Sequence, residues 1–249
     1  MVDGELKGFT KRVKDILSTV AFAERIKVLD FLNVSEQGVL ESMVAKFDDV
    51  SLIFNGGFIS AERQRAVIFP SSLPTTKIDP KVSIFKIEVI GTGEITHSQV
   101  LGSLMALNID RSVIGDITVD TKGTMFAACG EFHEFLVENL TKVGRYDIYL
   151  SVVEEEIMRE VHTEELEVIV SSMRLDVIVK TLINASRGKA EEYLDAGFVR
   201  LNHMVDKKPS RICHIGDILS IRKHGRFKIV EIKKTTKSGK LILVVSKSI

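Results

Sequence analysis

The chain has 249 residues, with 34 Lys and Arg against 34 Asp and Glu, so its formal net charge is zero. Its hydrophobic content of 45% excludes a disordered polymer, and its apolar runs are far shorter than the roughly 20 residues that span a bilayer. The charge is unevenly placed: residues 171–249 hold 17 basic and 7 acidic residues, whereas residues 1–170 hold 17 and 27. An acidic body joined to a basic C-terminal module favours nucleic-acid contact.

The start of the chain and the cysteines indicate a cytoplasmic protein. The first eight residues mix acidic and basic side chains, unlike a secretory signal. Cys129 and Cys213 lie far apart and form neither a metal spacing nor a disulfide framework. The six histidines are scattered as well. We therefore expect no membrane segment, no metal and no other cofactor.

Residues 1–75 are expected to form a small N-terminal α+β domain. Apolar residues at helical spacing predict helical structure over residues 9–50, with a break beginning at Leu32-Asn33 and a second helix capped by Ser35. Strands are predicted over residues 51–54 and 65–69. Three charged residues are interpreted as part of a solvated edge strand, with a functional role as the alternative: Glu62, Arg63 and Arg65.

Residues 76–165 are expected to form a ferredoxin-type domain like the RNA-recognition (RRM) fold. The predicted order is β-α-β-β-α-β, with elements over residues 82–90, 96–107, 115–119, 124–128, 131–143 and 146–153. Phe85, Phe126 and Tyr146 are expected in the core, so base stacking on this sheet is not assigned. Arg111 is equally compatible with an RNA contact and a structural salt bridge.

The acidic run Glu154–Glu167 is interpreted as a solvated connector, and a domain boundary is placed near residue 170. After it, residues 170–249 predict a compact αα-β unit. A first helix spans residues 175–183, and a second is capped by Ser186 and ended by Gly197. Short strands follow over residues 199–201 and 218–221, with a terminal basic hairpin turning at residues 237–240.

The basic residues of this C-terminal unit are placed where a phosphate backbone could contact them. Arg187 and Lys189 lie in the first turn of the second helix, where free backbone N–H groups favour anions. Arg174 begins the first helix. The following strand and loop carry four more basic residues: Arg200, Lys207, Lys208 and Arg211. Such contacts give salt-dependent binding with little specificity for the nucleotide sequence.

The same segment resembles an S4 RNA-binding domain. The motifs, in family order, are Arg174-Leu175-Asp176, Ser186-Arg187-x-x-Ala190, Gly197-x-Val199-x-Leu201-Asn202, Lys208-Pro209-Ser210 and Gly216-Asp217-x-Leu219. The resemblance adds Ser186 and Asn202 to the RNA-binding candidates. It implies binding to structured RNA. His203 departs from the usual small residue after the Asn.

Motifs upstream extend the resemblance over nearly the whole chain. They are Glu36-Gln37, Asn55-Gly56-Gly57-x-x-x-Ala61-Glu62-Arg63, Thr96-His97-x-x-x-Leu101-Gly102 and Arg111-x-x-x-Gly115-Asp116-Ile117. They resemble the YlmH family of bacterial S4 proteins. This resemblance implies an N-terminal α+β domain, an RRM-like middle domain and a C-terminal S4 domain. It also implies rRNA and tRNA as partners, on the large ribosomal subunit, in quality control of stalled nascent chains.

Two other functions stay open at this point. Arg174-Leu175-Asp176 also resembles the catalytic tripeptide of pseudouridine synthases, which would make Asp176 catalytic, although no synthase domain surrounds it. The acidic N-terminal half is a candidate surface for a protein partner, as in a cell-division scaffold. We favour a non-catalytic RNA-binding factor.

Overall fold

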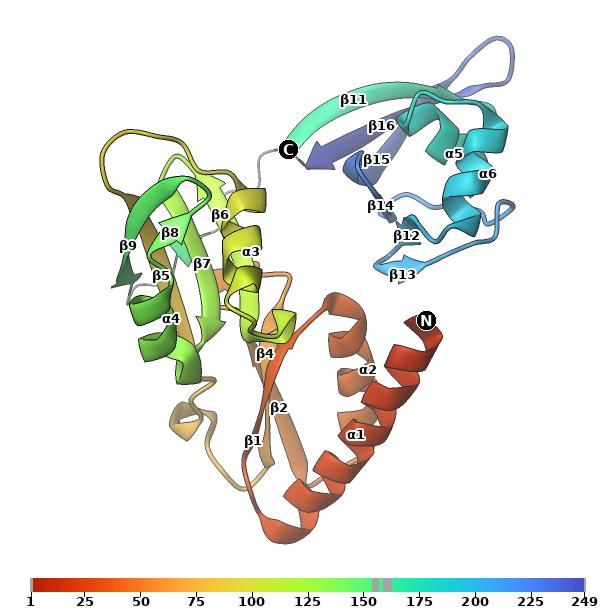
Figure 1. The fold of residues 1–249 in the computed structure, drawn as a ribbon. Helices are drawn as coiled ribbons and strands as arrows, with labels where there is room; N and C mark the ends of the chain where they lie inside the picture. Colours follow the sequence, from red (N-terminus) through yellow and green to blue (C-terminus); the bar gives the residue numbers. More distant parts are fainter. Residues whose placement is uncertain (1, 154–156, 159–162, 249) are drawn as a thin grey trace. The chain divides into compact units, whose positions relative to one another are not determined.

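The computed structural model describes residues 2–153, 157–158 and 163–248 (Figure 1). It is a mixed α+β protein that divides near residue 160 into two compact units. The first unit holds the N-terminal and middle sheets, and the second holds a six-stranded sheet. Among the described helices, none is long and apolar enough to cross a membrane.

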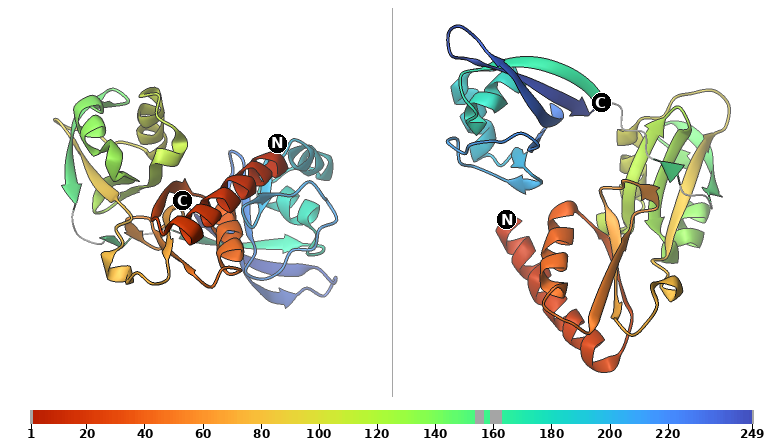
Figure 2. Two further views of the ribbon diagram at one scale, coloured as in Figure 1. Left: turned by 90° about the horizontal axis from the view of Figure 1, so that it is seen from below. Right: turned by 180° about the vertical axis from the view of Figure 1, so that it is seen from behind.

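The N-terminal part of the first unit is a three-stranded antiparallel sheet with order β1-β4-β2, packed against two helices (Figure 2). Its elements are α1 (Val2–Ala23), β1 (Lys27–Leu32), α2 (Val34–Val44), β2 (Val50–Asn55), β3 (Phe58–Ile59) and β4 (Gln64–Pro70). Apolar residues of α1 recur every three or four positions and are fully buried: Val13, Leu17 and Val20. The strands at residues 51–54 and 65–69 are confirmed.

The prediction of helical structure over residues 9–50, with a break beginning at Leu32-Asn33, is wrong for the stretch before that break. Helix α1 ends before Glu24, whose φ of 48° lies in the left-handed region, and the chain then forms β1. The cap of α2 is Asn33 instead of Ser35. Its Oδ1 accepts a hydrogen bond from the Glu36 N–H at 3.1 Å, and the Glu36 carboxylate accepts one from the Asn33 N–H at 2.8 Å.

The middle part of the first unit is a five-stranded antiparallel sheet with order β6-β7-β5-β9-β8. Its elements are β5 (Val82–Val89), α3 (His97–Ala106), β6 (Ile114–Asp120), β7 (Gly123–Cys129), α4 (His133–Asn139), β8 (Lys142–Val143) and β9 (Tyr146–Val153). Thr96 caps α3 as predicted, through a capping box with Gln99. The helix predicted over residues 131–143 is shorter, because residues 142–143 pair with β9. Short 3-10 turns occupy Thr75–Lys77, Arg111–Val113 and Gly130–Phe132.

The N-terminal and middle sheets share one buried interface. Phe31, Phe58 and Ala61 from the N-terminal part belong to the core of the middle sheet. Gly57 has a φ of 83°, and a Cβ on it would lie 3.0 Å from Ile84. The loop between β2 and β3 therefore lies directly against the middle sheet, which requires a glycine there.

The interpretation of Glu62, Arg63 and Arg65 as part of a solvated edge strand is wrong. Strand β4 is the central strand of its sheet, and the Arg65 side chain is only 2% exposed. The backbone N–H groups of Glu62 and Arg63 donate to the Asp116 carboxylate at 2.7 and 3.2 Å. These residues join the two sheets to each other.

The second unit is a six-stranded sheet with order β11-β16-β15-β14-β12-β13, covered on one face by two helices (Figure 1). Its elements are β11 (Thr163–Val170), α5 (Leu175–Leu182), α6 (Arg187–Asp195), β12 (Val199–Leu201), β13 (Met204–Val205), β14 (Ile218–Ile221), β15 (Gly225–Thr235) and β16 (Leu241–Ser248). The predicted helices, strands and terminal hairpin are all present.

The acidic run is only partly described, because residues 154–156 and 159–162 lie outside the described residues. Residues 157–158 form β10 (Ile157–Met158), a short strand parallel to β3. Strand β11 pairs along its whole length with β16. The end of the acidic run is thus an edge strand of the C-terminal sheet instead of a connector, although Glu164, Glu165 and Glu167 are exposed as predicted.

Candidate nucleic-acid interface

A buried carboxylate organises the start of both C-terminal helices. The Asp176 side chain is fully buried, and both of its oxygens accept hydrogen bonds from Arg174, at 3.0 Å each. Arg187, in the first turn of α6, lies 2.8 Å from the same carboxylate. Asp176 therefore fixes two of the predicted RNA-binding arginines side by side.

The environment of Asp176 also sets its protonation. Burial alone raises its pKa, but the hydrogen bonds from Arg174, the positive charge of Arg187 and the Val177 N–H outweigh burial and hold the pKa below its usual value. The same contact with Asp176 raises the pKa of Arg174. The carboxylate is thus held in its charged form.

We expect the C-terminal unit to lose stability in acid through this carboxylate. Since the pKa of Asp176 is lowered in the folded state, its stabilising contribution is present above the usual Asp pKa of about 4 and is lost as the pH falls through its folded value. Urea unfolding of Asp176→Asn should depend less on pH between about 2 and 5 than that of the native chain. Asp195→Asn, at an exposed position in α6, is the control. Identical pH profiles for Asp176→Asn and the native chain would contradict this assignment.

The first turn of α6 presents further candidate residues. Ser186 caps the helix, its hydroxyl accepting from the Lys189 N–H at 3.3 Å. Arg187 and Lys189 have side chains 57% and 54% exposed, and each also contacts a glutamate of the same helix. Exposed pairs of this kind are weak, so an incoming phosphate can compete for these cations.

The loop after β13 lies next to the start of α5, because the Leu175 N–H donates to the Arg211 carbonyl at 2.8 Å. Arg211 pairs with Asp206 at 2.7 Å. Lys207 and Lys208 are exposed and pair with no carboxylate within the described part of the chain. This loop and the helix starts bring six of the nine predicted residues together: Arg174, Ser186, Arg187, Lys189, Lys208 and Arg211. The Lys207 side chain lies instead beside Gly197, at the other end of α6.

Asn202 and Arg200 do not belong to the group of residues at the helix starts. Asn202, with a φ of 48°, donates to Asp217 at 2.8 Å and accepts from the Ile218 N–H at 2.9 Å, so its side chain holds the β12–β13 turn to β14. Arg200 is exposed between buried Val199 and half-buried Leu201. Since side chains alternate along a strand, Arg200 points to the face of the sheet opposite α5 and α6.

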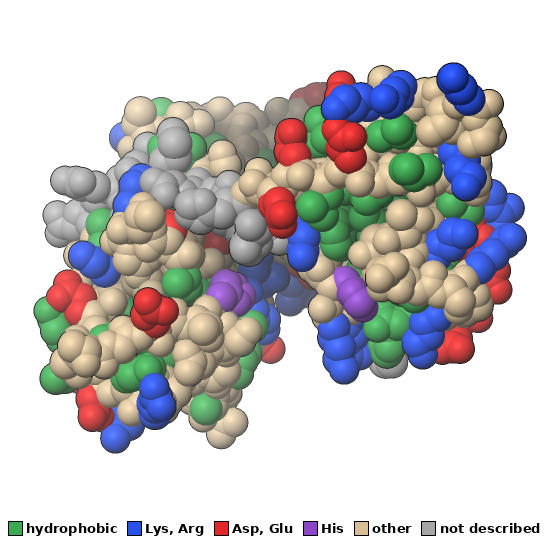
Figure 3. All heavy atoms as spheres, turned by 90° about the horizontal axis from the view of Figure 1, so that it is seen from above, with side chains coloured by type: hydrophobic (Ala, Val, Ile, Leu, Met, Phe, Trp, Pro, Cys, Tyr) green, Lys and Arg blue, Asp and Glu red, His purple; other side chains and the backbone are tan. Residues whose placement is uncertain are grey.

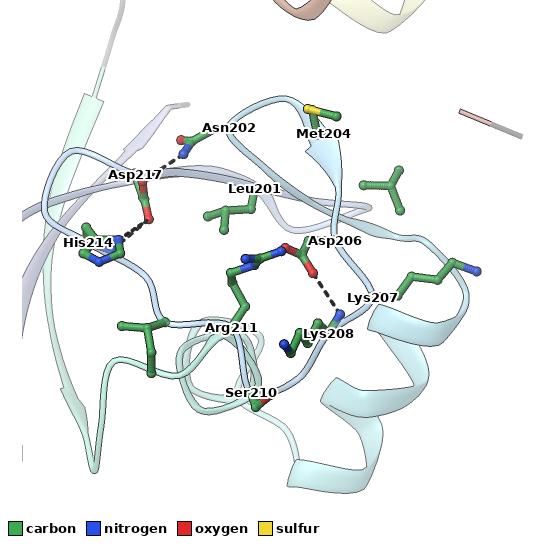
Figure 4. Close-up of a pocket in the computed structure, with 12 residues that line it drawn as sticks. Leu201, Asn202, Met204, Asp206, Lys207, Lys208, Ser210, Arg211, His214 and Asp217 are labelled. Atoms are coloured by element: carbon green, nitrogen blue, oxygen red, sulfur yellow. Dashed lines mark hydrogen bonds and ion pairs between the residues drawn. The ribbon is translucent and has the colours of Figure 1, made fainter. Parts of the chain in front are cut away.

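A hollow of about 940 Å³ lies between the β12–β13 hairpin and the loop that follows (Figure 4). Figure 4 shows Arg211 extending toward Asp206, with Leu201 pointing inward from β12. Met204 and Ile212 also line the hollow, although their side chains are 47% and 51% exposed. Sequence reasoning missed both. Apolar residues within a basic loop were the available signal.

The middle-domain residues considered as possible RNA contacts make most of their contacts inside the protein. Arg111 donates to the carbonyls of Ile114 and Gly115, and burial lowers its pKa to about 10. Phe85 and Phe126 are fully buried and stacked on each other. Tyr149, which the sequence analysis did not single out, is 53% exposed and contacts Glu88. Among the described residues, no group of three or more His, Cys, Asp or Glu could hold a metal.

Charge is visibly segregated on the C-terminal unit. Figure 3 shows Lys and Arg side chains around much of its rim, with hydrophobic side chains exposed between them; acidic side chains gather along one edge, and a few lie among the basic ones on the other side. The acidic edge fits β11, which carries Glu164, Glu165 and Glu167. The basic rim is the kind of surface that RNA phosphates bind.

Comparisons with known proteins agree with these features. The family model described as "Putative RNA-binding domain in YlmH" matches residues 77–156, and the S4 domain model matches residues 173–219. The ribosome-associated protein quality control protein P2 of Bacillus subtilis (strain 168) is 31% identical over 219 residues, covering 87% of this chain and 85% of that protein. The chain belongs to the YlmH family of S4-domain RNA-binding proteins.

All nine predicted RNA-binding residues of this YlmH-family protein lie within residues 173–219, the segment that the S4 domain model matches. A solved structure, the cell division protein ylmH from Streptococcus pneumoniae, covers 60% of this chain and 91% of its own, with a TM-score of 0.52 and 22% identity. That likeness concerns the fold alone.

Proposed function

We propose that this YlmH-family protein is a non-catalytic, cytoplasmic factor that docks on structured rRNA and tRNA through its S4 domain. The proposed place of docking is the large ribosomal subunit, during quality control of stalled nascent chains. The name of the Bacillus subtilis relative supports the process. The gathering of Arg174, Arg187 and Lys189 at two adjacent helix starts is the observation that carries RNA docking.

The domain division supports the same proposal. We assign residues 1–75 to an N-terminal α+β domain, 76–165 to an RRM-like domain and 170–249 to the S4 domain with its basic β tail. In the middle sheet, the strand order β6-β7-β5-β9 puts the second, third, first and fourth strands side by side, the order expected for a ferredoxin-type fold. The β2–β3 loop covers part of that sheet, so we assign the RNA contact to the S4 domain.

A pseudouridine-synthase reading requires Asp176 to reach a substrate base. Its carboxylate is fully buried and is held by Arg174 and Arg187. A nucleophile in that position would have to break both ion pairs and move to the surface. The geometry therefore favours a structural role for Asp176.

The variant Arg187→Ala with Lys189→Ala tests RNA docking. We expect it to leave ribosomal fractions at moderate salt while remaining folded, because both changed side chains are largely exposed and Arg174 retains its two hydrogen bonds to the buried Asp176 carboxylate. If both contact phosphates, the slope of log affinity against log salt should fall by roughly 2. Sedimentation with purified large subunits and a salt titration measure these effects.

The variant Lys11→Ala with Lys14→Ala is the matched control. It changes the net charge equally, at exposed positions of α1, and should sediment like the native protein. Unchanged sedimentation of the α6 variant would overturn docking through the S4 helix start.

A further inference from the structure

The hollow beside the helix starts combines two features that a phosphate-binding surface alone does not need. It has apolar walls, because Met204 and Ile212 line it with about half of each side chain exposed. It has a flat ring, because His214 also lines it and is 77% exposed. Exposed apolar side chains grouped at a hollow mark binding sites.

Cations lie at the same hollow. Lys208 lines it with no carboxylate partner among the described residues, and Arg211 crosses it in the direction of Asp206 (Figure 4). A ligand that fits both the apolar walls and these cations has a flat, weakly polar face and a negative charge. An RNA nucleotide has that combination.

The walls are held in place by the protein itself. Asp206 accepts from Arg211 at 2.7 Å and from the Lys208 N–H at 2.9 Å. On the other side, Asp217 accepts from Asn202 and from the His214 N–H, both at 2.8 Å. These bonds fix the hairpin and the loop before any ligand arrives, which lowers the entropy cost of binding.

The position of the hollow links it to the phosphate contacts. Its loop is hydrogen-bonded to the start of α5 through the Leu175 N–H and the Arg211 carbonyl. An RNA whose backbone contacts Arg174 and Arg187 therefore passes beside the hollow. Paired bases are stacked inside a helix and cannot enter, whereas a bulged or looped base can.

We propose that this hollow binds one unpaired nucleotide of the docked RNA. The base stacks on His214, Ile212 and Met204, and its phosphate contacts Lys208 and Arg211. This inference rests on the proposed RNA docking and adds a preference for RNA with an unpaired base next to a helix.

The test compares two RNA hairpins that bind the full-length protein, one with a fully paired stem and one with a single bulged 2-aminopurine. The bulged hairpin should bind roughly five- to tenfold more tightly, from stacking of one base. The 2-aminopurine fluorescence should change on binding. Ile212→Ser and His214→Ala should each reduce this preference while leaving affinity for the paired hairpin unchanged.

Ile215→Ser is the matched control, since Ile215 is 57% exposed in the same loop but does not line the hollow. It should retain the full preference. Equal affinity of the native protein for both hairpins, or a preference that survives Ile212→Ser and His214→Ala, would overturn the inference while RNA docking stands. Failure of both hairpins and of ribosomal RNA to bind would instead refute RNA docking. A fluorescent acidic peptide whose binding requires Ile212, with RNA affinities unaffected by Ile212→Ser, would reassign the hollow to a protein ligand.

Discussion

Replacing Arg65 by Met is expected to lower the free energy of unfolding of the first unit by about 1–3 kcal/mol, because the buried Leu29 carbonyl loses its side-chain donor, while the Lys81 carbonyl keeps the Gly130 N–H at 2.7 Å. The Arg65 side chain is 2% exposed and donates to the carbonyls of Leu29 and Lys81 at 3.0 and 2.6 Å. It also contacts the Glu131 carboxylate at 2.7 Å. Methionine retains much of the packing and removes every one of these hydrogen bonds. Urea unfolding followed by far-ultraviolet circular dichroism measures the loss.

Glu131→Gln is the control for the ion pair itself. A glutamine amide oxygen can still accept from Arg65, which also keeps its two backbone acceptors, so Glu131→Gln should cost less than Arg65→Met although the Arg65 side chain is only 2% exposed. Hydrogen exchange should show increased opening of both β1 and β5 in Arg65→Met, since the two carbonyls belong to or border these strands. A loss no larger than that of Glu131→Gln would show that the carbonyl contacts contribute little.

Gly57→Ala is the second substitution with a large expected effect. Alanine at a φ of 83° is strained by about 1–2 kcal/mol. The new methyl group would also lie 3.0 Å from side-chain atoms of both Val82 and Ile84, which adds about 1–3 kcal/mol of overpacking. Chemical denaturation gives the sum of the two effects.

The variant Gly91→Ala separates the backbone strain from the overpacking. Gly91 also has a positive φ, of 96°, but a Cβ on it would meet no atom within 4 Å. It should show the strain alone, and the difference between the two variants reports how closely the β2–β3 loop contacts the middle sheet. Equal losses for the two glycines would refute that close contact.

Local patterns predicted the elements whose signals lie within a few residues. Thr96 caps α3, and Ser186 and Gly197 bound α6, because caps and left-handed glycines act over one turn. Strand β1 was missed for the opposite reason. Its apolar residues continue the spacing of the preceding helix, and pairing with β4, more than 30 residues away, decides its conformation.

Long-range contacts also explain what the sequence could not show at the candidate site. The basic residues at the starts of α5 and α6 were found from their type and position. That Asp176 holds Arg174 and Arg187 together depends on how two helices pack. Arg65 was read as exposed because arginine usually is, whereas its burial follows from three backbone and carboxylate acceptors on separate segments.

The interface between the first two sheets limits how the chain can be divided. The matched RNA-binding segment, residues 77–156, begins after β4, so a fragment cut at those bounds loses Phe31 and Phe58 from its core and Arg65 from Glu131. Such a fragment would expose an apolar patch around Ile84 and is expected to aggregate. A deletion series should therefore keep the first unit whole, and in-frame loss of the N-terminal helices alone should reduce the cellular amount of the entire protein.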